Sequence, residues 1–512
     1  MMKITQRFLL VWIVLALCCF AASAQDAGQV LRFSVQYNTL KNSTKMSDEM
    51  RTEVERLEKL AQEANAARRY GEAIKHLSQA SATLRGQQWT AARALTAALT
   101  MKPNRAVVEP SENVQLQLRQ IFSLDVKSDA KLNGTVELLP VQGTDALKTL
   151  KTIEGIAADF ISHPTSIEIS IPDVLPGNYR LSLTLKFADA AETVNKTVLV
   201  HIERGLAGKF KAAKEEALKI ETRLRAEKKD SLLAALPTAS YRIRLFEMAS
   251  ASEMNFARID FNEELKEALA LLDQLKGGLD PFRARRGDFR KAYLSKVDNT
   301  LQPYRVFVPS SYDSSKAYPL IIALHGMGGD ENSYFDQYLQ GGFKVNAEKR
   351  GYIVACPKGR EPASMYTGSA ELDVMDVLEE VRRAYSIDAD RIYLTGHSMG
   401  GYGTWSIAMK HPEIFAALAP VAGGGTPAAM SKIAHIPQLV VHGDNDKTVP
   451  VERSRVMVEA AKKLGVEIKY IEIPGGDHIT VAARTFKDVY DFFDTHRRKN
   501  TGAKAAGAAK GN

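Results

Sequence analysis

The 512-residue sequence predicts a multidomain protein whose C-terminal part is a mostly parallel β-sheet with helices on both faces. Three observations lead to this fold class. The chain is too long for one hydrophobic core, so several domains are expected. Before residue 291, helical periodicity gives way to alternating strands and then returns. From residue 291 onward, continuous apolar runs alternate with helical patterns, which is typical of a parallel sheet covered on both sides.

Residues 1–24 have the pattern of a secretory signal peptide. Lys3 and Arg7 precede the apolar run from Phe8 to Phe20, and Ala22 and Ala24 follow at the spacing that a signal peptidase requires. The run is short for a bilayer-spanning helix, although a retained membrane anchor is the alternative. We expect a secreted or periplasmic protein with no stable membrane span after cleavage.

Charge and cysteine content restrict the classes of function. The formal net charge of +8 is mild for this length, and the basic residues gather in charged helices and in the tail 498–512, which we predict to be disordered. Nucleic acid is therefore not an expected partner. Cys356 is the only cysteine after the signal region, so no intrachain disulfide is expected. Its apolar neighbours predict a buried core residue rather than a nucleophile.

Residues 25–102 are predicted to be helical, because apolar residues recur at helical spacing from Met50 to Leu99. The segment ARRYGEAIKHLSQASATLRG faintly resembles a tetratricopeptide repeat. It lacks a convincing second copy, and one such unit does not bury its own apolar face. A plain helical bundle is therefore our prediction for this region.

Residues 103–204 are predicted to form an immunoglobulin-like β-sandwich. Val114 to Leu118 and Tyr179 to Leu185 alternate apolar and polar residues, as half-buried strands do. Residues 205–290 return to helical periodicity with dense charge and end in a linker-like segment. These modules carry no recognisable reactive groups, and protein or carbohydrate contact is the role that we expect for them.

The segment Gly396-His397-Ser398-Met399-Gly400 follows the apolar run Ile392 to Leu394 and fits the pattern G-x-S-x-G. In this pattern a sharp strand-to-helix turn exposes the serine hydroxyl at the edge of the sheet. Side chains at the two glycine positions would collide with neighbouring backbone in so tight a turn. A serine hydroxyl becomes a nucleophile only beside a base, which in turn needs a carboxylate to orient it.

Both partners of the serine follow downstream strands. HGDND at 442–446 follows one apolar run, and GGDH at 475–478 follows the next. The order serine, acid, histidine is the order that this sheet topology imposes. We expect His325 and His397 to pack and hydrogen-bond within their loops rather than act as the base. Asp477 is expected to cap the loop or the helix after it.

Five segments between residues 291 and 497 resemble the α/β-hydrolase superfamily, specifically secreted esterases of the polyhydroxybutyrate depolymerase and feruloyl esterase type. They are YRVFVPSSYD, LIIALHGMGGDE, GHSMGGYGTW, HGDNDKTVP and GGDH. GHSMGGYGTW is also similar to predicted peptidases of the prolyl oligopeptidase class. The resemblance implies Ser398 as nucleophile, Asp446 as acid and His478 as base. The family's H-G-x-x-D placement favours Asp446 over the alternative Asp444.

The resemblance also implies an oxyanion hole made by the backbone N–H groups of Met327 and Met399. Tyr366, Tyr402 and Trp405 are candidates for an aromatic wall that binds substrate, with core packing as the alternative for the last two. No organic cofactor is expected, because triad chemistry requires none. No metal is expected either, since the histidines lack compact zinc spacing.

We therefore predict a serine esterase that cleaves a small-molecule or polymer-attached carboxylic ester through a Ser-His-Asp triad and an acyl-enzyme intermediate. The short segment between Val421 and Leu439 leaves no room for a cap insertion there, which predicts an open site. Two alternatives stay open. One is a serine peptidase of the prolyl oligopeptidase-like type, whose propeller repeats we do not find. The other is a binding or scaffold protein with an inert hydrolase domain.

Overall fold

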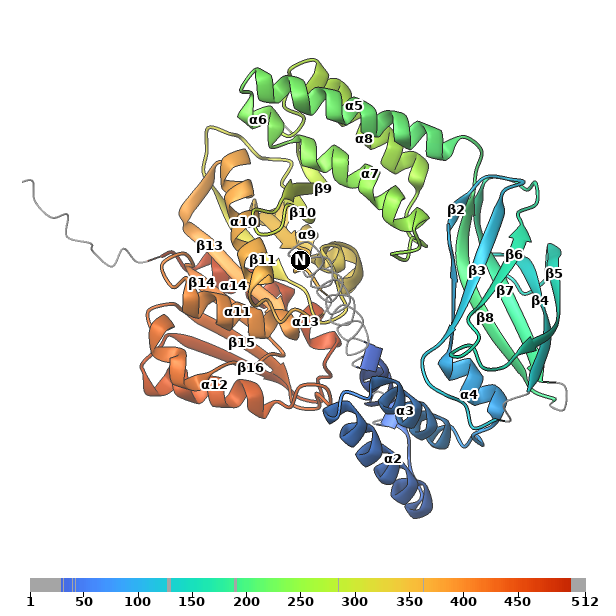
Figure 1. Ribbon diagram of the computed structural model, residues 1–512. Helices are drawn as coiled ribbons and strands as arrows, with labels where there is room; N and C mark the ends of the chain where they lie inside the picture. Colours follow the sequence, from blue (N-terminus) through green and yellow to red (C-terminus); the bar gives the residue numbers. More distant parts are fainter. Residues whose placement is uncertain are drawn as a thin grey trace, which may run out of the picture. The chain divides into compact units, whose positions relative to one another are not determined.

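The computed structural model describes residues 29–498 except 31, 39, 42, 127–129, 188–190, 284 and 362. The predicted signal peptide, 1–24, and the predicted tail beyond residue 498 lie outside the described residues. The chain divides into two compact units (Figure 1). The first comprises residues up to 210 together with 245–260, and the second comprises 211–244 together with 261 onward.

The first unit begins with helices. They are α2 (Asp48–Ala66), α3 (Tyr70–Leu84) and α4 (Ala91–Ala98). The side-chain oxygens of Ser47 and Thr90 accept hydrogen bonds from the backbone N–H groups of Met50 and Arg93, so they cap α2 and α4. The helical prediction fails at its C-terminal end, because β1 (Leu99–Pro103) already alternates buried and exposed residues.

Two β-sheets follow in this unit and share one hydrophobic core. One sheet has the order β1-β3-β6, and the other has the order β2-β8-β7-β4-β5. The strands are β2 (Val107–Val108), β3 (Asn113–Gln120), β4 (Lys131–Pro140), β5 (Lys148–Ala157), β6 (Thr165–Ser170), β7 (Gly177–Phe187) and β8 (Thr193–Ile202). Period-two alternation places Val114, Leu116 and Leu118 of β3 on the buried face.

Four helices precede the second unit's sheet: α5 (Leu206–Ala226), α6 (Asp230–Leu233), α7 (Leu236–Ser250) and α8 (Phe261–Lys276). Arg242 of α7 pairs with Glu264 of α8 at 2.5 Å, and Glu264 also pairs with Arg290 at 3.0 Å. Arg290 lies on β9 (Gly287–Leu294), the first strand of the sheet. The predicted domain boundary at 291 therefore needs correction, because it cuts β9 and separates paired charges.

The sheet of the second unit has the order β16-β15-β14-β13-β11-β12-β10-β9. Its further strands are β10 (Leu301–Val308), β11 (Tyr318–Leu324), β12 (Ile353–Pro357), β13 (Ile387–His397), β14 (Ala417–Val421), β15 (Gln438–Gly443) and β16 (Ile468–Ile473). Strands β11 to β16 pair in parallel, whereas β10 pairs antiparallel with β9 and β12. The predicted mostly parallel sheet is thus confirmed.

Helices cover both faces of this sheet. They are α9 (Gly342–Arg350), α10 (Ser369–Ala384), α11 (Met399–Lys410), α12 (Glu452–Lys463), α13 (Thr480–Arg484) and α14 (Phe486–Asp494). Phe343 of α9 and Tyr490 of α14 pack in one core with Ile321 and Tyr393, which point to the same face. Trp405 of α11 instead donates a hydrogen bond to Gln438, which points to the opposite face.

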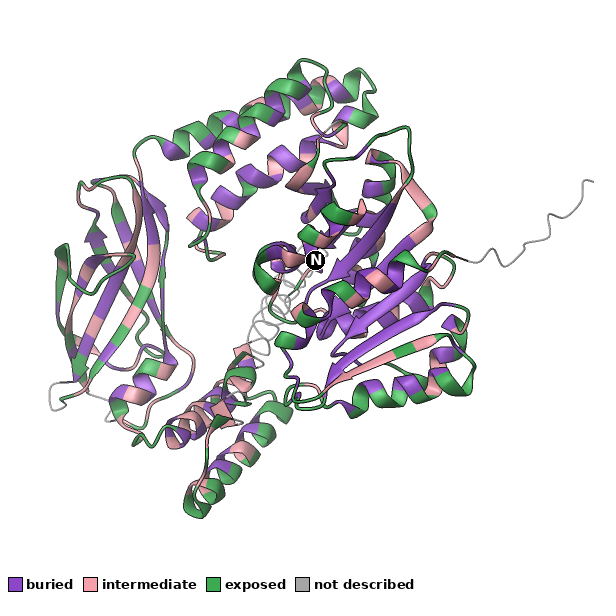
Figure 2. Cartoon of the chain, turned by 180° about the vertical axis from the view of Figure 1, so that it is seen from behind, coloured by how far each residue is buried: buried purple, intermediate pink, exposed green. Residues whose placement is uncertain are grey.

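The strands in the middle of the sheet are almost wholly buried, as Figure 2 shows. Cys356 lies in β12, and burial raises the pKa of its thiol well above the usual range, as expected for a core residue. Within the described part of the chain, no helix has the length and apolar character needed to cross a membrane.

Candidate active site

Ser398 lies at the junction of β13 and α11 in a strained turn. Its backbone has φ 55° and ψ −116°, a region that non-glycine residues rarely occupy. A Cβ atom on Gly396 would approach the Gly400 carbonyl oxygen to 2.3 Å, and one on Gly400 would approach the Leu324 oxygen to 2.0 Å. The two glycines are therefore required by close backbone approach, and the turn holds the serine at the carboxyl end of β13.

The structure brings Ser398, His478 and Asp446 together from the ends of three strands. His478 follows β16, and its Nε2 lies 2.9 Å from Ser398 Oγ. Its Nδ1 lies 2.6 Å from Oδ2 of Asp446, in the loop after β15. Since a carboxylate only accepts hydrogen bonds, Nδ1 carries the proton and Nε2 is free to accept one from the serine. All three side chains are buried.

Asp446 is held as a carboxylate by its hydrogen bonds. Burial acts to raise its pKa, but hydrogen bonds from His442 and His478 and from the Val449 N–H outweigh burial, so the pKa falls well below its usual value. The N–H groups of Thr448 and Val449 each donate to Oδ1 at 2.8 Å. This carboxyl is therefore ionised throughout the neutral pH range.

The alternative acid, Asp444, has a different position. Its Oδ1 accepts a hydrogen bond from the Gly475 N–H at 2.7 Å, so it joins two loops and does not contact the imidazole. Asp477 accepts hydrogen bonds from the N–H groups of Ile479 and Thr480 at 2.9 and 2.8 Å, ahead of α13. Both aspartates thus support the loop that presents His478.

A second set of hydrogen bonds was not predicted from sequence and links the loops around the serine. The Gly326 N–H donates to the Tyr338 hydroxyl oxygen at 3.3 Å, and that hydroxyl lies 3.0 Å from Nδ1 of His397. Nε2 of His397 lies 2.7 Å from the carbonyl oxygen of His478, so it carries the proton. No sequence pattern indicated the role of Tyr338, because it lies far from the G-x-S-x-G motif in the chain. His442, which hydrogen-bonds Asp446, could have been found, because it opens the HGDND segment.

His397 is therefore a neutral structural residue. Its burial, and then the neighbouring His478, lower its pKa to about 4. The ring of His325 is also held in place by its loop, because its two ring nitrogens lie 2.8 and 2.7 Å from the carbonyl oxygens of Gly326 and Lys358. Neither imidazole contacts the Ser398 hydroxyl, and both support loops at the strand ends.

The two predicted oxyanion donors lie close to Ser398. Met399 follows it in the chain, and Met327 belongs to a loop that passes it in space. Met399 is the first residue of α11, where backbone N–H groups have no acceptor within the helix. Met327 follows Gly326, at which a Cβ atom would lie 3.4 Å from Cβ of Ser398. The loop after β11, which is the third strand of this sheet in chain order, thus passes close to Ser398. The role of both N–H groups stays a prediction.

The predicted aromatic wall is corrected by the burial of its members. Tyr366 is fully buried, with its ring against Gly403, and Trp405 is fully buried with its indole N–H donating to Gln438 at 2.9 Å. Both are core residues, since neither side chain is exposed to a ligand. Of the three candidates, Tyr402 alone is partly exposed.

Three exposed apolar side chains lie at the predicted oxyanion residue Met327 and at two positions that the sequence analysis did not name. Met327, Leu339 and Ile479 are 44%, 64% and 64% exposed, and we call them the apolar rim. Each directly follows a residue of the hydrogen-bonded set around Ser398: Gly326, Tyr338 and His478. Exposed apolar residues that neighbour a polar centre in the chain are candidates for contact with a ligand.

A mostly parallel sheet that presents serine, acid and histidine in this order at three strand ends defines the α/β-hydrolase class. Residues 365–490 match the family described as PET hydrolase-like. Over 144 residues the chain is 31% identical to a bifunctional acetylxylan esterase/xylanase of Neocallimastix patriciarum, covering 28% of this chain and 21% of that protein. The matched part of the chain is thus similar to esterases of the α/β-hydrolase class.

Two further relatives are an esterase and a polyester depolymerase by name. The chain is 28% identical to a probable feruloyl esterase C of Aspergillus terreus, covering 29% of this chain and 56% of the relative. It is 30% identical to poly(3-hydroxyalkanoate) depolymerase C of Paucimonas lemoignei, covering 24% and 32%. The matched region therefore spans only part of these relatives. Among solved structures, a thermostable esterase is 18% identical with a TM-score of 0.39, covering 78% of this chain and all of that chain.

Proposed function

We propose that this protein is a serine hydrolase that cleaves carboxylic esters. The observation that carries the proposal is the hydrogen-bond relay from Ser398 through His478 to Asp446. A buried, ionised Asp446 orients the imidazole, and the imidazole is positioned to take the serine proton. The esterase relatives support ester cleavage as the reaction of this domain.

The mechanism follows from the positions of these groups. Ser398 Oγ attacks the ester carbonyl carbon while His478 Nε2 takes its proton, and the N–H groups of Met327 and Met399 hold the oxyanion. The imidazolium then gives the proton to the leaving alkoxide, which departs as the alcohol. Water attacks the acyl-enzyme with His478 again as base, and the acid is released. Asp446 stabilises the imidazolium without itself becoming protonated.

The apolar rim supports an ester with an apolar or aromatic acyl group. Between β14 and β15 the chain forms only the short helix η3 (Pro427–Ile433), so no cap domain is inserted there. An uncovered site suits an ester attached to a polymer, as the names of the acetylxylan esterase and polyhydroxyalkanoate depolymerase relatives suggest. Secretion to the periplasm or medium, with an immunoglobulin-like sandwich as accessory module, belongs to the same proposal.

The test compares wild-type protein with Ser398→Ala. Wild type is expected to hydrolyse p-nitrophenyl acetate and methyl ferulate and to react with a fluorophosphonate probe. Ser398→Ala is expected to lose the labelling and on the order of 10⁶ in turnover, with unchanged circular dichroism. Ser315→Ala, an exposed serine ahead of β11, is the matched control.

Prolyl and aminoacyl anilides are assayed beside the esters. Faster cleavage of the anilides would replace the esterase assignment by a peptidase. Absence of both activities in well-folded wild-type protein would reject catalysis altogether.

A further inference from the structure

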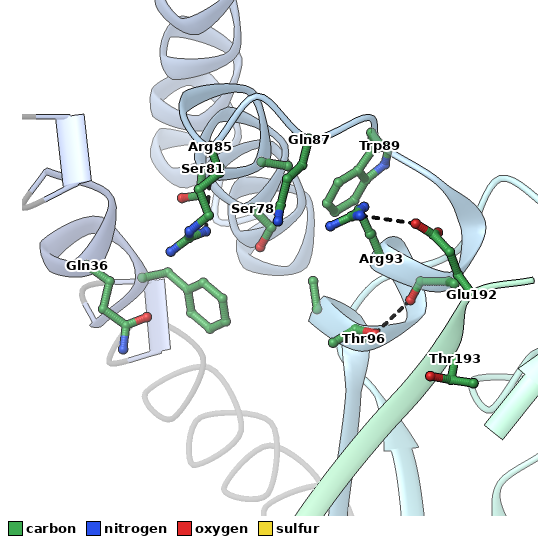
Figure 3. A pocket seen from close by; sticks show the side chains of 14 residues that line it. Gln36, Ser78, Ser81, Arg85, Gln87, Trp89, Arg93, Thr96, Glu192 and Thr193 are labelled. Atoms are coloured by element: carbon green, nitrogen blue, oxygen red, sulfur yellow. Dashed lines mark hydrogen bonds and ion pairs between the residues drawn. The ribbon is translucent and has the colours of Figure 1, made fainter. Parts of the chain in front are cut away.

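The first unit contains a cavity of about 490 Å³ to which the reaction at Ser398 assigns no role. Its walls come from the segment with Phe33 and Gln36, the C-terminal half of α3, α4, and the beginning of β8 (Figure 3). This volume lies in the range of sites for small organic ligands. The cavity therefore joins the helices and the second sheet of this unit into one candidate binding site.

Two aromatic side chains line the cavity. Trp89 lies in the loop between α3 and α4 and is half-buried, and Phe33 is half-buried as well. Figure 3 shows Trp89 on one side of the cavity and Gln36 on the other. An indole ring offers a large flat apolar face, which suits a ligand with an apolar face and a polar edge. Pyranose rings have this character, since their axial C–H groups form a face and their hydroxyls form the rim.

The polar lining is mostly uncharged. Besides charged groups, the walls carry amide and hydroxyl side chains that both donate and accept hydrogen bonds: Gln36, Ser78, Ser81, Gln87, Thr96 and Thr193. Ser78 Oγ and Arg93 Nε are buried without a hydrogen-bond partner among the described residues. These two atoms lie behind the accessible wall, so the other amide and hydroxyl groups of the wall are the ones that offer hydrogen bonds to a ligand.

The charges in the wall largely neutralise each other. The Arg93 guanidinium pairs with Glu192 at 3.1 Å, and the Thr90 hydroxyl donates to the same carboxylate. The Thr90 hydroxyl, together with Arg93, lowers the pKa of Glu192 below its usual value. Arg85 is the one other cationic side chain among the lining residues of this cavity, and it is exposed. Paired donors and acceptors of this kind favour a neutral ligand rich in hydroxyls over an anion.

We propose that this cavity binds a neutral oligosaccharide, with Trp89 stacking on a sugar ring and the Arg93–Glu192 pair holding its hydroxyls. Arg93 donates hydrogen bonds to hydroxyl oxygens, and Glu192 accepts them from hydroxyl hydrogens. The site is separate from Ser398 and does not depend on the esterase activity. It would hold the protein on a polysaccharide whatever ester the second unit cleaves.

The test titrates full-length Ser398→Ala protein with xylohexaose, cellohexaose, tetragalacturonate and ferulate by calorimetry and tryptophan fluorescence. Trp89 and Trp405 are the tryptophans of the described chain, and Trp405 is fully buried in the other unit. The third tryptophan of the sequence, Trp12, lies in the predicted signal peptide, so the titration uses a Trp12→Phe background, in which a fluorescence change reports on Trp89. At least one neutral hexasaccharide is expected to bind and to change this fluorescence.

Variants show whether the cavity is the site. Trp89→Ala is expected to weaken binding at least about tenfold, and Gln87→Ala roughly twofold to tenfold. Gln88→Ala is the matched control, because Gln88 is equally exposed but does not line the cavity. Thermal unfolding checks that Trp89→Ala still folds, and Gln87→Ala tests the site if it does not.

Three outcomes overturn the proposal: no binding of either neutral hexasaccharide, binding unchanged in both cavity variants, or binding of the acidic probes alone.

Discussion

At the scale of single residues, the acid loop distinguishes two aspartates that differ by two positions. Asp446→Asn is expected to lose on the order of 10⁴ in turnover, because an amide stabilises the wrong tautomer of His478 and does not stabilise its imidazolium. Asp444→Asn is expected to lose less than about tenfold, since Asp444 contacts only the Gly475 N–H. Steady-state kinetics on p-nitrophenyl acetate compares the two variants. A larger loss for Asp444→Asn would transfer the acid role to that residue.

His397 predicts a pH dependence of stability. Its pKa is about 4 in the folded chain and 6.5 in the unfolded chain, so the unfolded state binds a proton first as pH falls. This group's stabilising contribution is complete above pH 6.5 and is lost progressively down to about pH 4. The loss is on the order of 3 kcal/mol. Asp446, with a depressed pKa, loses its contribution only at lower pH, below the usual carboxyl range.

Urea unfolding at pH 7.5 and pH 4.5, in a background that carries Trp12→Phe and Trp89→Phe, measures this effect through Trp405 in the second unit. His397→Gln is expected to be less stable at pH 7.5 but to lose less stability between the two pH values. His435→Gln is the control, because His435 is exposed. The same pH slope in His397→Gln and wild type would show that this buried histidine does not carry the effect.

At the scale of elements, the sequence predicts what local chemistry determines. The need for glycine on both sides of Ser398 follows from the clashes that a side chain would make within one turn. The acid and the base follow strands that are recognisable in the sequence as apolar runs. Tyr338 was missed because its contact with His397 depends on how two distant loops meet. Tyr366 was misplaced and Trp405 was left open between substrate contact and core packing, because the sequence pattern does not tell a substrate-facing aromatic residue from a core one. Leu99 was taken as helical because a five-residue strand is too short for its alternation to stand out.

The apolar rim gives an element-scale prediction about specificity. Contact with one of these side chains is worth about 1 kcal/mol, a fraction of the 1.5–3 kcal/mol for full burial of such a side chain. Leu339→Ser and Ile479→Ser are therefore each expected to lower kcat/KM on p-nitrophenyl butyrate about fivefold more than on p-nitrophenyl acetate. Leu464→Ser, which replaces another exposed leucine directly after α12, is the control. Equal losses on both esters would show that the rim does not contact the acyl chain.

At the scale of the whole molecule, most of the helical segment before the sheet, residues 211–244 and 261–276, belongs to the reactive unit. Glu331 is buried, and burial raises its pKa despite the opposing effect of Arg290, which lies 3.4 Å away on β9. Thr238 of α7 accepts a hydrogen bond from the Ala292 N–H at 3.1 Å. Residues 291–497 contain every predicted reactive group, so nothing in the sequence indicated that the preceding helices are needed. Charge pairing across the boundary was not visible, because its members lie far apart in the chain.

This arrangement predicts different behaviour for two fragments. Residues 206–498 keep α5 to α8, all of β9 and the Arg290 pairs, so this fragment is expected to fold and to hydrolyse p-nitrophenyl acetate within about threefold of the full-length kcat/KM. Residues 291–497 lose Arg290 and leave Glu331 buried without its partner. Removing one member of a buried pair costs about 3–5 kcal/mol, a large part of a typical domain's stability. We therefore expect the shorter fragment to be insoluble or to unfold at much lower urea concentration.

Arg290→Ala in the longer fragment separates the charge effect from the loss of the helices, and it is expected to lower the urea midpoint while leaving kcat/KM nearly unchanged at low denaturant. Since no triad side chain pairs with Arg290, a loss of activity without a loss of stability would mean that the pair shapes the site itself. Full stability and activity of the 291–497 fragment would instead restore the boundary that the sequence suggested and would make the helices a separate module.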